Sequence, residues 1–264
     1  MKTIPKLLPI AVLAFASLGC MKNDNERVKA ASWDHDDKNT PPPGKTVTDA
    51  PTPRISANTH LASGRMLEQQ NDLTGAIRQY EKAIANNPRL VEGHNRLGIA
   101  YQKLERMTDA ERYFKRGLSV APDSAMLHNN LGYCYLLQDK LQAAESEFKN
   151  ALAISPAFER ARMNYAIVLA RTDRFEESVK EFTQVVPAEV AYYNVAVICC
   201  EKEQFSEAED ALRRSLKINP KYQPASDQLD RIVALADEKR GPNRVRINLA
   251  EEHERAGEDA ALQP

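Results

Sequence analysis

Three histidines, His60, His94 and His128, recur along the chain at one constant interval. Histidine is a common metal ligand, so a recurring set of this kind raises the question of a metal site. Zinc holds its ligands within about 2.3 Å of one centre. Equivalent positions in stacked helical units lie roughly 10 Å apart, because packed helices are about 8–10 Å from axis to axis. The three histidines therefore cannot share one ion, and we expect them to be partly buried packing residues.

The sequence also lacks the common motifs of catalysis. It has no G-x-x-x-x-G-K-[ST] loop, no H-E-x-x-H pair, no G-x-S-x-G elbow and no G-x-G-x-x-G after a strand. The run Asp34-His35-Asp36-Asp37 lacks the alternating spacing and central glycine of a calcium-binding loop, so a solvated acidic patch is the simpler interpretation. We predict that the protein is not an enzyme and has no cofactor, bound metal or small-molecule substrate.

The charge balance bears on the class of partner. The 264 residues include 36 Lys and Arg against 37 Asp and Glu, for a formal net charge of −1. Nucleic-acid-binding domains usually carry a basic surplus, so we expect no nucleic-acid partner.

The first twenty residues have the organisation of a bacterial export signal. A basic start precedes an apolar run over 7–18, which is too short to cross about 30 Å of hydrocarbon. The run ends in ASLGC and resembles the lipobox of bacterial lipoproteins, although Ser17 stands where Leu is commoner. This resemblance implies that residues 1–19 are removed and that Cys20 is lipidated, which would anchor the protein to the membrane. The alternative is an ordinary signal peptide with an incidental cysteine.

Two further segments show no helical or strand periodicity. Residues 20–56 are rich in proline, charged and small residues, as expected for a disordered tether between a lipid anchor and a folded domain. Residues 237–264 are charged, and we expect a flexible tail.

Met21 follows the cysteine in place of the aspartate that retains enterobacterial lipoproteins in the inner membrane. We therefore expect a cell-envelope location at the outer membrane, facing the periplasm.

Between these segments the sequence repeats itself. Pro88, Pro122 and Pro156 are equally spaced, and aligning on them brings small and aromatic residues into register. The matching sets are Gly64, Gly98 and Gly132; Ala76, Ala110 and Ala144; and Tyr80, Phe114 and Phe148. The small residues let two helices approach closely, the aromatic residue fills the adjoining space, and proline ends the second helix. These columns, with their period of roughly 34 residues, resemble those of the tetratricopeptide repeat (TPR).

The resemblance implies an all-α fold, a right-handed superhelical solenoid of about five helix hairpins plus a C-terminal capping helix. Pro220 falls four positions short of two further periods after Pro156, so one unit is shortened, and Pro187 ends it early. The predicted array covers residues 57–236, divided into units 57–90, 91–124, 125–158, 159–188 and 189–222 and a cap over 223–236.

In TPR arrays the first helices line a concave groove, and the resemblance carries that groove to fixed positions in each unit. The candidate groove residues are Asn95, Ile99, Lys103, Asn129, Tyr133, Leu136, Leu137, Met163, Ile167, Tyr193 and Val197. They are polar at the start of the array and apolar from the third unit onward, which favours a protein or peptide partner. Asn95, Asn129 and Lys103 would bind the backbone or termini of a peptide. Alternatively, Met163, Ile167 and Val197 pack against the last hairpin or the tail.

Three cysteines remain once Cys20 is set aside. Cys134 and Cys199 fall at core-facing positions of first helices, where buried and inert thiols are expected. Cys199 and Cys200 are adjacent, which is poor geometry for a disulfide between them. Cys200 falls at a groove position and is the thiol to test by labelling.

Among TPR lipoproteins, the closest resemblance is to the TadD-type proteins of tight-adherence (Flp) pilus assembly. It rests on the lipobox, the proline-rich spacer, the short fourth unit and the Asn-Asn-Leu-Gly run at 129–132. It implies a non-catalytic interaction scaffold on the bacterial envelope, supporting pilus or secretion-system assembly by binding peptides. Type IV pilus pilotins share the layout. The alternative function is a docking adaptor for a periplasmic enzyme such as a peptidoglycan hydrolase. The sequence does not identify the partner.

Overall fold

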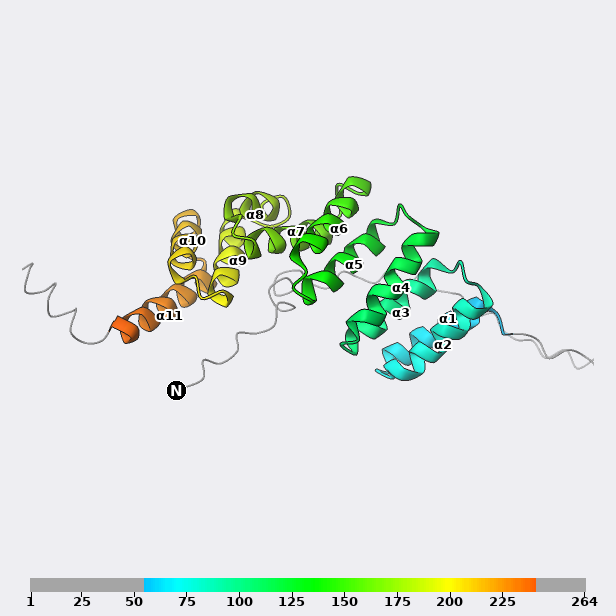
Figure 1. Ribbon diagram of the computed structural model, residues 1–264. Helices are drawn as coiled ribbons and strands as arrows, with labels where there is room; N and C mark the ends of the chain where they lie inside the picture. Colours follow the sequence, from blue (N-terminus) through cyan, green and yellow to red (C-terminus); the bar gives the residue numbers. More distant parts are fainter. Residues whose placement is uncertain (1–54, 241–264) are drawn as a thin grey trace, which may run out of the picture.

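The computed structural model describes residues 55–240, which form eleven α-helices and no strand. Ten of the helices pair into five hairpins, and the last follows alone (Figure 1). The first helices are α1 (Ala57–Gln69), α3 (Val91–Lys103), α5 (Ala125–Leu137), α7 (Glu159–Arg171) and α9 (Ala188–Glu201). The second helices are α2 (Leu73–Asn86), α4 (Met107–Val120), α6 (Leu141–Ile154), α8 (Phe175–Phe182) and α10 (Phe205–Ile218), and α11 spans Gln223–Arg240.

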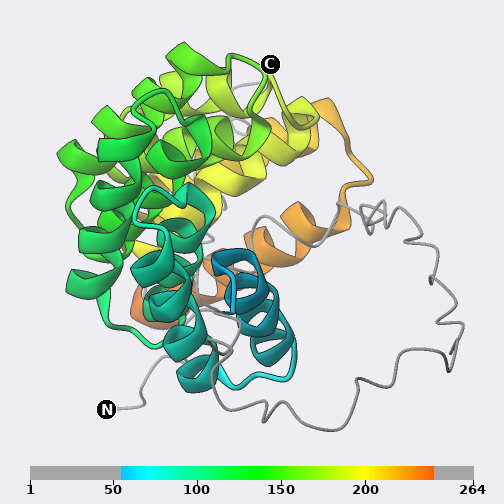
Figure 2. The same ribbon diagram turned by 90° about the vertical axis from the view of Figure 1, so that its right-hand side faces the viewer.

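The hairpins follow one another around an arc, so that the fold is a superhelical stack (Figure 2). Each helix contacts its hairpin partner and the next hairpin, and one continuous hydrophobic core runs through the array. This arrangement confirms the predicted all-α solenoid of five hairpins with a terminal helix.

Close contact between a glycine and an aromatic ring joins the two helices of the first three hairpins. A Cβ atom added to Gly98 would lie 2.4 Å from Cε1 of Phe114, and one added to Gly132 would lie 2.8 Å from Cε1 of Phe148. These rings are fully buried, so they have no room to move away. The repeated glycine and aromatic columns therefore follow from helix packing.

Each hairpin turns through one residue with a left-handed backbone. These residues are Asn71, Glu105, Asp139, Asp173 and Glu203, with φ between 56° and 62°. Asn and Asp tolerate this conformation better than other residues with a side chain. Glu105 and Glu203 are therefore the strained versions of the turn.

The three histidines form hydrogen bonds within their own hairpin or to the turn that precedes it. Nδ1 of His128 lies 2.6 Å from Oε2 of Glu147, and its Nε2 lies 2.9 Å from the carbonyl oxygen of Pro122. Arg162 takes the same position in the fourth repeat and donates to Glu181 and to the carbonyl of Pro156. The histidines are thus packing residues with defined hydrogen bonds. Within residues 55–240, no group of three His, Cys, Asp or Glu side chains is placed to hold a metal ion.

The fourth repeat differs from the others. Its second helix, α8, has 8 residues, whereas α2, α4, α6 and α10 each have 14. Pro187 stands at the N-cap of α9, which begins at Ala188, one residue before the start predicted for the fifth unit. Proline suits this place because it has no N–H to leave unpaired.

The terminal helix α11 runs to Arg240, beyond the predicted end of the cap at Ala236. Ala225 and Ile232 are its buried residues. Val233 and Leu235 are apolar residues of the same helix, but their side chains are 39% and 38% exposed. The helix packs against α10 and, through Gln228, against α9, and no further hairpin follows it within the described residues to cover its other face.

Several predictions fall on residues outside the described range. These are the signal peptide over 1–19, lipidation of Cys20, the tether as far as residue 54 and the tail from residue 241. Within the described part of the chain, no helix has the length and apolar character needed to span a bilayer.

Candidate peptide-binding groove

The candidate groove residues lie on the successive first helices α3, α5, α7 and α9, each of which contacts the next. We call the surface formed by these helices and α1 the inner face. The half-buried candidates are Ile99, Tyr133, Tyr193 and Val197, and the exposed ones are Lys103 and Leu137. The buried candidates are Asn95, Asn129, Leu136, Met163 and Ile167.

Part of the apolar stretch predicted from the third unit onward is therefore buried. Leu136, Met163 and Ile167 are only 1%, 8% and 6% exposed, on helices that pack against their hairpin partners and against neighbouring repeats. The apolar side chains that do reach solvent on the inner face include Leu137, at 39%, and Met126, at 43%. Met126 was not among the candidates, although it lies at the second position of its unit, one that the resemblance also assigns to the groove.

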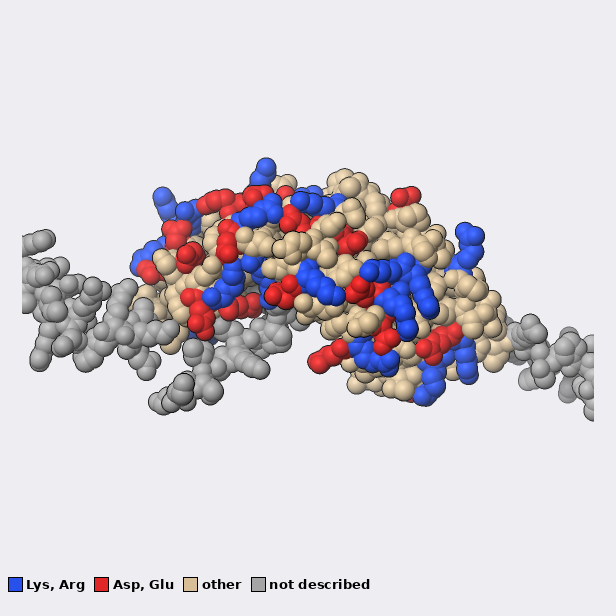
Figure 3. Space-filling model, in the orientation of Figure 1, with Lys and Arg blue, Asp and Glu red and all other residues tan. Residues whose placement is uncertain are grey.

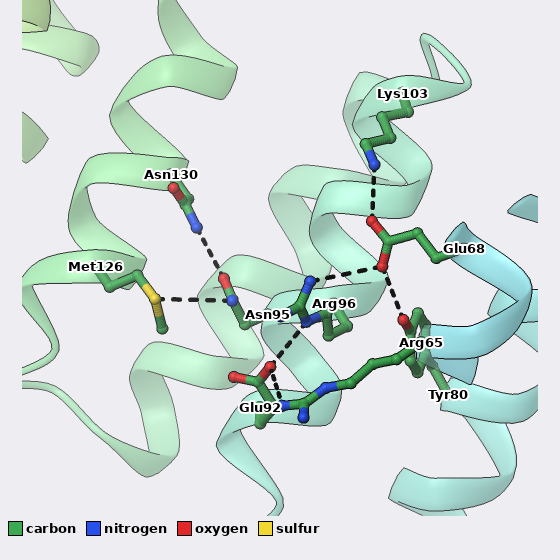
Figure 4. A network of polar contacts seen from close by, with 9 residues as sticks. All are labelled: Arg65, Glu68, Tyr80, Glu92, Asn95, Arg96, Lys103, Met126 and Asn130. Carbon is green, nitrogen blue, oxygen red and sulfur yellow. Dashed lines mark hydrogen bonds and ion pairs between the residues drawn. The ribbon is translucent and has the colours of Figure 1, made fainter. Parts of the chain in front are cut away.

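Asparagine side chains form a hydrogen-bonded chain across three first helices. Asn164 on α7 donates to Asn129 on α5 at 3.0 Å, and Asn129 donates to its neighbour Asn130 at 3.1 Å. Asn130 then donates to Asn95 on α3 at 2.8 Å (Figure 4). Together with the bond from Asn164, the chain crosses two gaps between repeats. It ends at the thioether of Met126, 3.9 Å from Nδ2 of Asn95.

Asn194 on α9 occupies the equivalent position to Asn130 and Asn164. Its residue is 6% exposed, and its amide makes no hydrogen bond within the described residues. The preceding repeat has Met163 where the chain would need another asparagine. The sequence contained a signal for this set. Asn130, Asn164 and Asn194 hold the same position in the third, fourth and fifth units, once the shortening of the fourth unit is taken into account.

A charged network covers the inner face at the first two repeats. Glu68 accepts hydrogen bonds from Lys103 at 2.7 Å and from Tyr80 at 2.8 Å (Figure 4). Burial alone would raise the pKa of Glu68, but these hydrogen bonds and the nearby Arg96 outweigh it and hold the pKa below its usual range. Lys103 was expected to be available for a peptide terminus. Its ammonium group instead lies against a carboxylate.

Arg96 links Glu68 to a second carboxylate. Its Nε donates to Glu92 at 2.8 Å, and Arg65 donates to the same oxygen at 2.9 Å. Burial opposes ionisation of Glu92, but the two guanidinium groups dominate and lower its pKa. Figure 3 shows Lys and Arg alternating with Asp and Glu over the visible face of the array. This part of the inner face therefore presents paired charges.

The other end of the inner face is covered by α11. The rings of Tyr193 and Tyr222 meet edge to face at 5.6 Å, and Gln228 lies 3.5 Å from Sγ of Cys200. Burial raises the pKa of the Cys200 thiol, which is 5% exposed. The thiol that the groove position had singled out for labelling is therefore covered.

The other two thiols are buried as predicted. Burial raises the pKa of Cys134 to about 11 and that of Cys199 to about 12. Reactive cysteines need an accessible thiolate, so neither side chain is suited to nucleophilic chemistry.

Sequence profiles described as TPR repeat or tetratricopeptide repeat match residues 64–105, 90–157, 135–194 and 190–222. Together they extend over parts of all five hairpins. The chain is a tetratricopeptide repeat protein. No curated protein matches it significantly.

Solved structures share the TPR fold. YrrB, described as a TPR protein with an unusual peptide-binding site, is 21% identical with a TM-score of 0.53, over 66% of this chain and 91% of YrrB. A TPR protein of Parabacteroides merdae is 12% identical with a TM-score of 0.55, over 67% of this chain and 72% of its own. PilF of Pseudomonas aeruginosa is 15% identical with a TM-score of 0.51, over 67% of this chain and 91% of PilF. At these identities, the likeness of this TPR protein to each structure concerns the fold alone.

Proposed function

We propose that this TPR protein is a non-catalytic scaffold that binds a peptide segment of a protein partner along the inner face. The observation that carries the proposal is the asparagine chain formed by Asn95, Asn129, Asn130 and Asn164. A primary amide has both donors and an acceptor, as a peptide bond does. An extended segment could therefore replace hydrogen bonds between asparagines with hydrogen bonds to its own backbone.

Asn194 extends this surface toward the C-terminal end. Its amide has no partner within the described residues, so a peptide amide placed there would form hydrogen bonds without breaking one between side chains. The exposed side chains of Met126 and Leu137 flank the asparagine chain and offer apolar contacts for side chains of the peptide. TPR proteins generally mediate protein–protein interactions, and YrrB is a related fold described as having a peptide-binding site.

We further propose that the scaffold is anchored to the bacterial envelope through Cys20 and serves pilus or secretion-system assembly. The support is the lipobox-like sequence before Cys20 and the resemblance to TadD-type lipoproteins. The second candidate, a docking adaptor for a periplasmic enzyme such as a peptidoglycan hydrolase, uses the same groove and the same anchor. Identifying the bound partner separates the two.

Site-specific photo-cross-linking in cells tests the groove. A photo-reactive residue at Leu137, on the inner face, is compared with one at Ile154, near the end of the second helix α6; the two side chains are 39% and 40% exposed. We expect a cross-linked partner from position 137 that is absent from position 154. Equal products from both positions, or none from 137, would contradict binding at the inner face.

The anchor is tested separately. We expect Cys20→Ser to move the protein from the membrane fraction to the soluble fraction, because two or three acyl chains provide stable membrane binding. If the variant still sediments with membranes after a salt wash, anchoring through Cys20 is wrong, whereas the groove proposal is unaffected.

A further inference from the structure

The histidine hydrogen bonds differ between repeats, and the difference isolates one polar atom. In the third repeat, His128 contacts the carboxylate of Glu147, and in the fourth Arg162 contacts Glu181. In the first repeat, Nδ1 of His60 lies 2.8 Å from Oε1 of Gln79. An acceptor oxygen thus stands at the same position of the second helix in these three repeats.

The second repeat has Tyr113 at this position, one period from both Gln79 and Glu147. Nε2 of His94 lies 2.8 Å from the carbonyl oxygen of Pro88, so this nitrogen is the donor. Nδ1 is buried and has no hydrogen-bond partner. An unpaired buried polar atom is unfavourable, and this repeat lacks the acceptor that the other three contain.

His94 and Tyr113 both line an open hollow of about 560 Å³ between α2 and α4. Apart from His94, its walls come from the second helices and the Pro88 turn, so it is distinct from the inner face. Arg116 lies at its edge, exposed, with its guanidinium 5.5 Å from the centre of the Tyr113 ring. Within the described residues, Arg116 has no carboxylate partner.

We propose that this hollow binds a carboxylate group of a protein partner, which takes the place that Glu147 and Glu181 hold in the later repeats. The carboxylate would accept a hydrogen bond from Nδ1 of His94 and pair with Arg116. Both nitrogens of His94 then donate, as the two contacts of His128 with a carboxylate and a carbonyl imply. The ring of Tyr113 must shift, because Nδ1 is covered.

Other charged groups near the hollow are compatible with this ligand. Glu81 is the acidic residue that lines it, and its carboxylate already accepts a hydrogen bond from Tyr101 at 3.0 Å. Arg112 lies over the Tyr113 ring at 5.0 Å, and its guanidinium already pairs with Asp109 at 2.8 Å. Arg116 is therefore the cation beside the hollow that a carboxylate would meet.

The test is NMR observation of the histidine ring nitrogens in the full chain during titration with short peptides. One peptide carries glutamate side chains and an amidated C-terminus, a second has only a free C-terminal carboxylate, and a third replaces glutamate with glutamine and is amidated. We expect a carboxylate peptide, and not the glutamine peptide, to shift the signal of His94 Nδ1. The first two peptides show whether a side chain or a chain end is bound.

His128 is the internal control, because its Nδ1 already has a carboxylate partner and should not respond. No response of His94 to either carboxylate peptide at millimolar concentration, or an equal response to the glutamine peptide, would overturn the proposal. It would leave an ordered water as the partner of Nδ1.

Two variants sharpen the test. Tyr113→Glu places a carboxylate where the third repeat has one, so the His94 signal should approach that of His128 and lose its response. If this variant does not fold, Arg116→Gln changes only an exposed side chain and should weaken binding at least several-fold. Unchanged affinity in Arg116→Gln would contradict the role of Arg116 and, with it, the site.

Discussion

The N-terminal and C-terminal parts of the inner face each contain a poorly exposed carboxylate, yet the two behave in opposite ways. Glu68, in the first repeat, has hydrogen bonds from Lys103 and Tyr80, and its pKa is lowered. Glu201, in the fifth repeat, has Arg171 as its cation, with the nearest atoms 3.6 Å apart. Burial outweighs this attraction and raises the pKa of Glu201. A buried carboxylate is therefore favoured only where hydrogen bonds and nearby cations offset the lost water.

The same contrast extends to the packing of the repeats. The first three hairpins use glycine against an aromatic ring, and their second helices have 14 residues each. The fourth has Ala166 at the glycine position and a second helix of 8 residues. Ser178 there donates to the carbonyl of Ala166 at 2.7 Å, so a hydrogen bond joins these two helices. The N-terminal repeats thus depend more on close steric fit.

The largest expected effect is at Gly98. We expect Gly98→Ala to lower the free energy of unfolding by about 1–3 kcal/mol, because the new Cβ would lie 2.4 Å from a buried ring. The matched variant Ala166→Gly, in the fourth repeat, should cost only about 0.5–1 kcal/mol through helix propensity. Urea unfolding of both variants measures the difference. Equal losses would contradict the contrast in packing.

The next effect is at Glu68. We expect Glu68→Gln to destabilise the protein by about 1–2 kcal/mol at neutral pH, because it removes the negative charge that strengthens the hydrogen bond from Lys103. The half-exposed Lys103 keeps the expected loss small. The pKa of Glu68 is lowered in the folded state, so its contribution is present above the ordinary value of 4.5 and is lost as pH falls through the folded pKa. Acid unfolding followed by circular dichroism should therefore depend less on pH in the variant.

Glu201 should show the opposite sign. Its folded pKa is raised, so stability falls as pH rises from the ordinary 4.5 through the folded pKa. We expect Glu201→Gln to raise the free energy of unfolding by roughly 1 kcal/mol at neutral pH, because the neutral glutamine avoids the cost of burying a charge. Destabilisation by this variant, measured by urea unfolding at pH 7, would show that Arg171 compensates the charge after all.

The smallest expected effect is in a turn. We expect Glu105→Asn to stabilise the protein by about 0.5–1 kcal/mol, because asparagine tolerates the left-handed backbone, φ 58°, better than glutamate does. Asn71→Glu, at the equivalent turn of the first hairpin, should lower the free energy of unfolding by a similar amount. Thermal unfolding of the two variants should therefore shift in opposite directions.

Much of the fold follows from the sequence because repeat columns report local packing. Gly98 and Phe114 must pair across one hairpin, and Pro88 must end one helix, whatever lies further along the chain. The inner face was harder to predict. Ile167 and Met163 look like groove residues on a single helix, but both are buried in a helix that packs against its hairpin partner and neighbouring repeats.

The sequence by itself determined the period, the hairpins, the shortened fourth repeat and the need for a terminal helix, since each depends on residues close together in the chain. Only the tertiary structure decided which inner-face side chains reach solvent, that Lys103 pairs with Glu68, and that asparagines of three repeats join into one chain. These features depend on the curvature of the stack, which sets the distance between residues of neighbouring repeats. That distance is a property of packed hairpins and is not encoded in any one column of the repeat.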